Sequence, residues 1–379
     1  MKTRTRFMSA MGLAIGAVAA FSGSASAAAV PFFHAGADNV VFVQDDSISG
    51  NHVLAYDRAE DGTLTLAGTY ATGGVGGVLT GSVVDHLASQ GSLTYDRRHG
   101  LLFAVNAGSN SVSVFSVSHD RLNLREVLPS GGSFPVSVAV HDDLLYVLNA
   151  RDGGSVQGYR VLFNIVFPLA RSARPLGLDV TATPEFTNTP GQVAFSPDGS
   201  QLIVTTKANG SSIDAFGVRF DGRLAAAPVV NSLPGAVPFA VDFDAAGHLV
   251  VAEAGTNALA TFSLAGNGTI SPIDTKLTGQ AATCWVVGAN GSFYASNAGS
   301  GSLSGFQSSL AGTLTPLGNT PTDKGTVDAA ATPDGHYLYV QTGAAGIVDE
   351  FSVNPDGSLT SIGSITVPNA VGGEGIVAA

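Results

Sequence analysis

The chain has 379 residues, of which 45% are hydrophobic, 12% are charged and 48 are glycines. This apolar content excludes a disordered chain, and abundant glycine with little charge favours short strands and tight turns over long, salt-bridged helices. The formal net charge of −12 argues against nucleic acid and anionic membranes as partners. We therefore expect a folded, all-β protein.

The N-terminus has the layout of an export signal. Three basic residues stand within the first six, an apolar run follows over residues 7–21, and Ala25-Ser26-Ala27 matches an A-x-A cleavage site. The apolar run is too short for a membrane span, and no later segment is long enough for one. We predict a secretory signal over residues 1–27 and a secreted or cell-envelope protein. Its removal would move the net charge from −12 to −15, because it takes away three basic residues and no acidic ones.

A repeated unit runs through the rest of the chain. The stretch VNAGSNSVSVF at residues 105–115 returns at residues 296–306 as SNAGSGSLSGF, with the same residue at 7 of 11 places. Each unit has a third β-rich run that ends in an aromatic residue. These aromatic residues are Tyr56, Phe115, Tyr159, Phe216, Phe262, Phe306 and Phe351. Two intervals are lengthened by inserts at residues 73–90 and 168–190, and without them the period is about 45 residues, as in four-stranded propeller blades.

Two-residue turns divide each unit into strands. Asp198-Gly199, Asn290-Gly291 and Asp334-Gly335 separate first and second runs, whereas Asp61-Gly62, Asp221-Gly222, Asn267-Gly268 and Asp356-Gly357 follow third runs. Asn-Gly and Asp-Gly pairs readily take positive φ at both positions, so each predicts a β-hairpin.

The order of the strands predicts how the ring closes. Six complete first strands precede the third strands, namely SLTYD, SVAVH, QVAFS, AVDFD, WVVGA and DAAAT. The seventh is expected at residues 375–379, because the repeats begin with a second strand at residues 39–44. Pairing these two segments would complete the first blade and remove two open edges. The sequence thus predicts one domain over residues 28–379, a seven-bladed β-propeller closed by its C-terminal strand.

The units QVAFSPDGSQLIVTT, AAATPDGHYLYVQTG and LLFAVNAGSNSVSVF resemble the repeats of the seven-bladed propeller lactonase family. That family includes 6-phosphogluconolactonase-type and carboxymuconate-lactonizing-type proteins, and the resemblance covers nearly all of the chain after the signal. It implies the propeller fold and, as an expectation, lactone hydrolysis. Similar PDG-x-x-LYV units also occur in propellers without lactone chemistry.

A candidate ligand site follows from strand direction. First strands begin, and second strands finish, at the same end of the channel, and there the repeats differ from one another in their polar residues. The candidate ligand-binding residues are Gln90, Asn106, Asn149, Gln192, Trp285, Asn297, Asp328, Gln341 and Glu374. A structural role is the alternative for the three asparagines, which satisfy backbone groups in many turns, and for Trp285, which is equally suited to packing.

Charged residues at the same end are the candidate catalytic groups. Opening a lactone needs a base for water and donors for the developing oxyanion. The family resemblance implies His, Arg and Glu around the channel, on GPRH-like entries and NE-like strand ends. The matching entry here is residues 189–192, TPGQ, without Arg or His, and its second strand ends in Lys207. We therefore assign Glu253 as the base and Lys207 and Arg151 as anion-binding groups, with surface exposure as the alternative for each.

Other chemistries have little support in the sequence. His86, preceded by Asp85 in the first insert, is either a base near the channel or a solvent-exposed loop residue. The single cysteine, Cys284, reads as a small buried hydrophobic residue and excludes an internal disulfide. We find no nucleophile elbow, zinc or phosphate-loop motif and expect no cofactor; scattered carboxylates at Glu253, Asp328 and Glu374 leave a metal open.

Two functions remain. The first is a secreted hydrolase that acts on a small cyclic ester at the channel mouth. The second is a non-catalytic propeller that binds a small molecule, a glycan or a protein there. In either case we expect a monomer. Export argues against a cytosolic sugar-phosphate lactone as the substrate.

Overall fold

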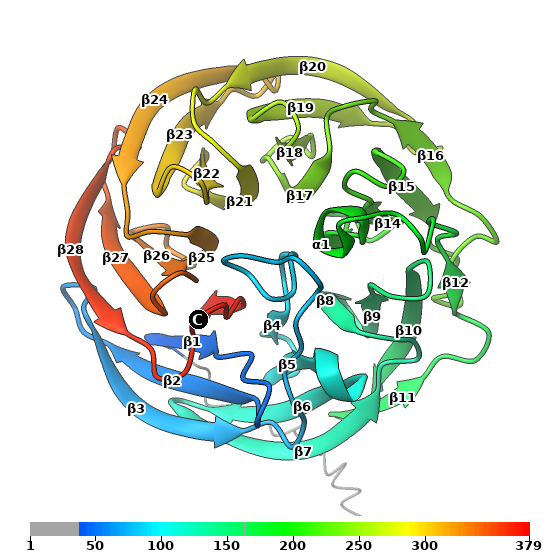
Figure 1. Cartoon of the computed structure of the whole chain (residues 1–379), viewed down its shortest axis with the longest axis horizontal. Coiled ribbons are helices and arrows are strands. Elements are labelled where there is room, and N and C mark those ends of the chain that lie inside the picture. Colours follow the sequence, from blue (N-terminus) through cyan, green and yellow to red (C-terminus); the bar gives the residue numbers. More distant parts are fainter. Residues whose placement is uncertain (1–37, 163) are drawn as a thin grey trace, which may run out of the picture. The chain divides into compact units, whose positions relative to one another are not determined.

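The computed structural model describes residues 38–162 and 164–379. The signal predicted for residues 1–27 lies outside the described residues. Within them, seven β-sheets are arranged around a central axis (Figure 1), which confirms the predicted seven-bladed propeller. No helix in the described part is long and apolar enough to cross a membrane.

Each blade is an antiparallel sheet whose first strand is innermost and whose fourth is outermost. Blade 1 consists of β29 (Ile376–Ala378), β1 (Val40–Gln44), β2 (His52–Arg58) and β3 (Leu64–Ala71). Blade 2 consists of β4 (Leu93–Asp96), β5 (Leu101–Asn106), β6 (Ser111–Ser118) and β7 (Arg121–Pro129), with the 3-10 helix η1 (Ala107–Ser109). Blade 3 consists of β8 (Pro135–His141), β9 (Leu144–Asn149), β10 (Ser155–Leu162), β11 (Ile165–Pro168) and the short β12 (Arg174–Pro175).

The remaining blades follow in chain order. Blade 4 consists of β13 (Gln192–Phe195), β14 (Gln201–Thr205), β15 (Ser212–Gly217) and β16 (Val229–Ser232), and helix α1 (Glu185–Asn188) precedes it. Blade 5 consists of β17 (Pro238–Phe243), β18 (Leu249–Glu253), β19 (Ala258–Leu264) and β20 (Ile270–Leu277). Blade 6 consists of β21 (Thr283–Ala289), β22 (Ser292–Asn297), β23 (Ser302–Ser308) and β24 (Leu314–Pro321). Blade 7 consists of β25 (Thr326–Ala331), β26 (Tyr337–Thr342), β27 (Ile347–Val353) and β28 (Leu359–Thr366).

The ring closes in blade 1 as predicted. The C-terminal strand β29 pairs with β1, with Phe42 opposite Val377. Two further backbone hydrogen bonds, Gln44 N–H to Gly375 and Ala379 N–H to Val40, both at 2.8 Å, extend this pairing at its two ends. One sheet thus joins the two ends of the repeat region, so the ring has no open seam.

The aromatic residue of each third strand is part of the core between neighbouring blades. All seven are at most 4% exposed. In five blades the register between the third and fourth strands shifts directly at this residue, as between Ala55 and Tyr56 or between Val114 and Phe115. A bulge increases the local twist of the strand. The periodic aromatic therefore marks both a core position and a recurrent bulge.

The seven predicted hairpin turns are present, but the expected backbone geometry is wrong for most of them. Only Asn290-Gly291 has positive φ at both positions; elsewhere the glycine alone is in the left-handed region. The reason is the side chain of the preceding aspartate or asparagine. In six turns its Oδ1 accepts the N–H two residues further on, as Asp61 does from Thr63, which holds the turn without a second positive φ.

Candidate functional site

The first insert, residues 73–90, crosses the channel at the end where second strands finish (Figure 1), and we call it the mouth loop. Its contacts reach blades on different sides of the ring. Gln90 exchanges two hydrogen bonds with the backbone of Val286 in β21, at 2.9 and 3.0 Å. Ser89 Oγ donates to the carbonyl of Val136 in β8. The channel is therefore covered by the protein's own chain at the mouth where we predicted a site.

The second insert, residues 168–190, fixes the mouth loop from one side. In helix α1, Glu185 binds the guanidinium of Arg151 at 2.6 Å and also accepts the N–H of Thr80 in the mouth loop at 2.7 Å. Arg151 itself donates to the carbonyl of Val78. The Arg151 hydrogen bond lowers the pKa of Glu185 to about 2. Arg151, predicted to bind an anion, thus already has a carboxylate partner.

Lys207 joins the two inserts. Its ammonium donates to the carbonyl of Ala88 in the mouth loop at 2.5 Å and to the carbonyl of Phe186 in α1 at 2.6 Å. The residue is 1% exposed, and Nζ lies 5.2 Å from the centre of the Phe239 ring. Burial lowers the pKa of Lys207 to about 7, against the attraction of the Asp85 carboxylate. Lys207 therefore fastens the mouth loop over the channel.

Glu253 occupies a separate position at the end of β18. Its carboxylate accepts a hydrogen bond from Thr256 Oγ1 at 3.0 Å, and burial raises its pKa. Among the described residues, no hydrogen bond or ion pair joins Glu253 to Lys207 or Arg151. Lys207 and Arg151 thus each contact both inserts, but neither is hydrogen-bonded to Glu253, the predicted base.

The predicted asparagines have structural partners. Asn106 donates to Ser111 Oγ and Ser113 Oγ, and Asn297 makes the same two bonds to Ser302 and Ser304. These positions are equivalent in the two copies of the repeated stretch. The repeat therefore keeps the same asparagine–serine hydrogen bonds between the second and third strands of both blades. Asn149 donates to the carbonyl of Ser130.

The other predicted residues also bridge elements of the fold. Trp285 Nε1 donates to the carbonyl of Ser89 at 2.5 Å, and Gln192 Oε1 accepts the N–H of Val241. Gln341 donates to the carbonyl of Gln44 in the neighbouring blade. Gln341 Oε1 has no partner in the described structure.

A group of buried carboxyls lies beneath the mouth loop. Glu374 accepts from Ser89 Oγ and from the backbone of Ser92, and its own N–H donates to Asp46. Burial raises the pKa values of Glu374 and Asp46 well above their ordinary range, and that of Asp328 to about 7. Repulsion by the Asp85 carboxylate adds to the shift of each pKa, whereas a hydrogen bond with Glu374 partly offsets the shift of Asp328. Within the described residues, no group of three His, Cys, Asp or Glu side chains is arranged to hold a metal ion.

A cavity of about 330 Å³ opens beside the mouth loop, and we call it the mouth pocket. Its lining comes from the mouth loop, α1 and blades 5 and 6. The lining residues are Val83, Val84, Asp85, Ala88, Phe186, Phe239, Ala282, Cys284, Trp285, Ala298 and Gly299. Val83 is 80% exposed, so the pocket reaches the surface at the loop. The Phe239 and Trp285 rings lie 4.8 Å apart.

Asp85 is the one carboxyl among the residues that line the mouth pocket. Its two oxygens accept the N–H groups of Leu87 and Ser89, at 2.8 and 2.9 Å. Burial raises the pKa of Asp85 to about 6, and burial also raises the pKa of the Cys284 thiol to about 12. In the sequence, Asp85 is notable only as the neighbour of His86, which is half-buried and whose pKa is lowered by burial.

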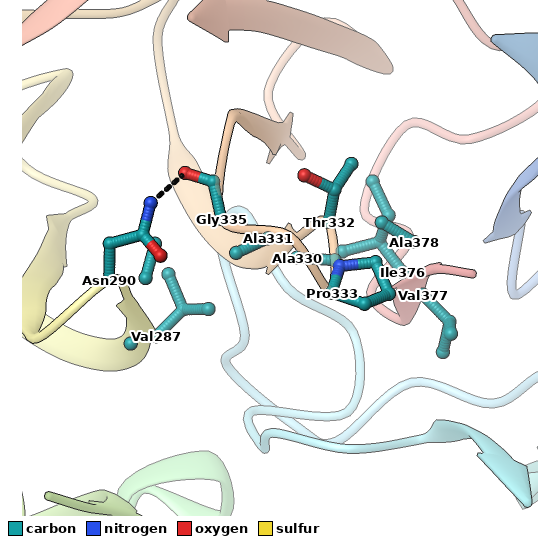
Figure 2. Close-up of a pocket in the computed structure, with 12 residues that line it drawn as sticks. Val287, Asn290, Ala330, Ala331, Thr332, Pro333, Gly335, Ile376, Val377 and Ala378 are labelled. Carbon is teal, nitrogen blue, oxygen red and sulfur yellow. Dashed lines mark hydrogen bonds between the residues drawn. The ribbon is translucent and has the colours of Figure 1, made fainter. Parts of the chain in front are cut away.

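A second pocket, of about 420 Å³, lies at the far ends of β21 and β25 and along β29 (Figure 2). Its polar side chains serve the neighbouring turns. Asn290 Nδ2 donates to the carbonyl of Gly335, and Thr332 Oγ1 donates to Asp334. No titratable side chain is among its lining residues, so this pocket, although larger, has no acid or base to offer a substrate.

Comparison with solved structures places the fold among propellers with lactonase names. A candidate 6-phosphogluconolactonase from Bacteroides uniformis is 18% identical, with a TM-score of 0.69, covering 88% of this chain and 97% of that one. The periplasmic gluconolactonase PpgL of Pseudomonas aeruginosa is 17% identical, with a TM-score of 0.69, covering 89% and 98%. A candidate 6-phosphogluconolactonase from Bacteroides fragilis is 17% identical, with a TM-score of 0.66, covering 90% and 97%.

These likenesses extend over almost the whole of each structure, and at such low identity they concern the fold alone. No protein-family model matches the chain, and no curated protein matches it. The fold expected from the family resemblance is thus supported, whereas the roles of Glu253, Lys207 and Arg151 stay predictions.

Proposed function

We propose that the protein binds a small, mainly apolar molecule in the mouth pocket. The observation that carries the proposal is a cavity of about 330 Å³ whose walls are aliphatic and aromatic except for one carboxyl and one thiol. Small-molecule sites have this character, a largely apolar concave surface with a few placed polar groups. A dry apolar cavity of about 150 Å³ is enough for benzene, so a substituted ring fits here.

The bonding of the mouth residues supports binding over hydrolysis. An oxyanion needs preorganised donors. The side-chain donors near the pocket already have protein acceptors: Trp285 binds Ser89, Lys207 binds two carbonyls, and Arg151 binds Glu185. A bound carbonyl would therefore have to displace existing bonds.

The place of action is also a proposal. The leader predicted in residues 1–27 supports export, so the ligand would be met outside the cytosol.

Lactone hydrolysis is the second candidate, and two observations favour it. Solved structures with lactonase names share the fold. In addition, Asp85 has a pKa raised to about 6 by burial in the pocket, which suits a general base near neutral pH. In this version a water molecule held by Asp85 would attack a ring ester in the mouth pocket.

The test of binding uses 4-propylphenol, titrated calorimetrically into the protein from residue 28 onward. Ala298→Phe, which fills the mouth pocket, should weaken binding at least tenfold. Ala331→Phe places the same ring in the pocket of Figure 2 and should leave binding unchanged. Loss of affinity in Ala331→Phe alone would overturn the proposal.

The test of hydrolysis uses dihydrocoumarin and glucono-δ-lactone with the same proteins. We expect no turnover above background. Hydrolysis that falls about 100-fold in Asp85→Asn would establish the second candidate. Hydrolysis that is instead lost in Glu253→Gln and Lys207→Ala would support the catalytic residues predicted from the sequence.

A further inference from the structure

The side chain of Asp85 is held in one orientation at the wall of the mouth pocket. Its two oxygens accept the N–H groups of Leu87 and Ser89, the Ala88 N–H also favours the charged carboxylate, and the residue is 4% exposed. A carboxylate oxygen can accept more than one hydrogen bond. Three of the roughly four acceptor sites of the carboxylate are thus engaged, and about one remains for a molecule in the pocket.

Among the described residues, no cationic side chain is hydrogen-bonded to Asp85. Lys207 is close enough to favour its charged form, but the ammonium donates to the carbonyls of Ala88 and Phe186 and not to the carboxylate. A carboxylate buried at the wall of an apolar cavity without a full set of donors is costly. A donor carried by the ligand would offset that cost.

The other groups of the lining offer a ligand few donors of their own. Trp285 Nε1 is bonded to the carbonyl of Ser89, and Cys284 presents a neutral thiol, a weak donor. The pocket thus provides one strong acceptor and no free strong side-chain donor. A ligand with an anionic group would be repelled by Asp85, and a cationic group would lose its hydration in a pocket whose other walls are apolar.

We propose that the natural ligand of the mouth pocket is an uncharged apolar alcohol or phenol whose hydroxyl donates to Asp85. The proposal rests on the binding function above and adds the chemical class. It makes Asp85 the residue that selects the ligand, while Phe239 and Trp285 enclose its apolar part. It also opposes the expectation of an anionic ring substrate, since a carboxylate would face Asp85.

Three probes that share a propylphenyl group test this class by calorimetry at pH 8, where Asp85 is ionised: 4-propylphenol, its methyl ether 4-propylanisole, and 4-propylbenzoate. We expect the ether to bind at least tenfold more weakly than the phenol, and the benzoate not to bind. In Asp85→Asn the advantage of the phenol over the ether should shrink several-fold, because a charge-assisted hydrogen bond becomes a neutral one.

The outcomes separate the two proposals. If the phenol and the ether bind equally, and both are lost in Ala298→Phe, the pocket binds ligands but the inferred class is wrong. If none of the probes binds, the binding function itself fails. If Asp85→Asn does not fold, the comparison of phenol with ether in the unaltered protein still decides, because it needs no variant.

Discussion

The two ends of the channel use the same side chain in opposite ways. At the mouth, Asp328 is buried and its pKa is raised to about 7, and Asp85 behaves similarly. At the other end, Asp334 caps the turn after β25. Partial burial pushes its pKa up, but hydrogen bonds from Thr332 and His336 outweigh that and lower it to about 2. Ionisation of the two aspartates at the mouth therefore destabilises the folded state, whereas ionisation of Asp334 at the far end stabilises it.

This contrast reflects what each end must do. Similar turns recur at the far end in several blades. In four of them an exposed aspartate carboxylate accepts a backbone N–H, which stabilises the turn without the cost of burying a charge. The mouth end contains two inserts that occur once. Some of their polar groups, such as Asp85 and Ser89, are buried, so the energetic balance there depends on contacts between distant segments.

The largest expected effect compares two positions on β21. Trp285 is 4% exposed at the mouth, whereas Val287, two residues on, lines the pocket of Figure 2 and is half-buried. Trp285→Ala should lower the free energy of unfolding by about 3–5 kcal/mol, and Val287→Ala by about 1 kcal/mol. Urea denaturation of both variants measures this. Equal losses would show that the mouth is no more tightly packed than the far end.

The next effect is the pH dependence of stability. Asp328 and Asp85 have folded pKa values of about 7 and 6, above those of the unfolded chain, so the folded state binds more protons between pH 4 and 7. Stability should therefore fall by a few kcal/mol as the pH rises through that range. Lys207 acts in the opposite direction above pH 7: its folded pKa of about 7 lies below the ordinary 10.5, so stability should recover between pH 7 and 10.

Denaturant midpoints recorded from pH 4 to 10 should thus pass through a minimum near pH 7. Asp328→Asn should flatten the acid side of this profile, and Lys207→Met the alkaline side. A profile with its maximum at pH 7 would contradict the buried carboxyls at the mouth.

Much of this arrangement follows from the sequence, because repetition reveals it. The period of the aromatic residues, from Tyr56 to Phe351, gave seven blades, and the missing first strand gave the closure through residues 376–378. Asn106 and Asn297 could also be predicted as structural, since the serines that they bind recur at the same spacing.

The candidate site could not be predicted in the same way. The mouth loop has no counterpart in other blades, so the repeat gives no indication of its course. Its contacts join residues that are distant in sequence, such as Gln90 with Val286 and Ala88 with Lys207. Charge pattern alone therefore identified Lys207 and Arg151 as available cations, although long-range contacts supply both with partners. The unusual length of the two inserts was the one available signal.

The smallest effect returns to the far end. Asp334→Ala removes the carboxylate that caps the turn and should cost about 1 kcal/mol at pH 7, because the N–H of His336 and the hydroxyl of Thr332 lose their acceptor. The folded pKa lies below that of the unfolded chain, so this stabilisation is present above pH 4 and is lost as the pH falls towards 2. Asp334→Asn keeps an acceptor oxygen and should retain most of it. If Asp334→Ala instead destabilised the protein as much as Trp285→Ala, the exposed turns would matter as much as the buried mouth, and the contrast between the two ends would fail.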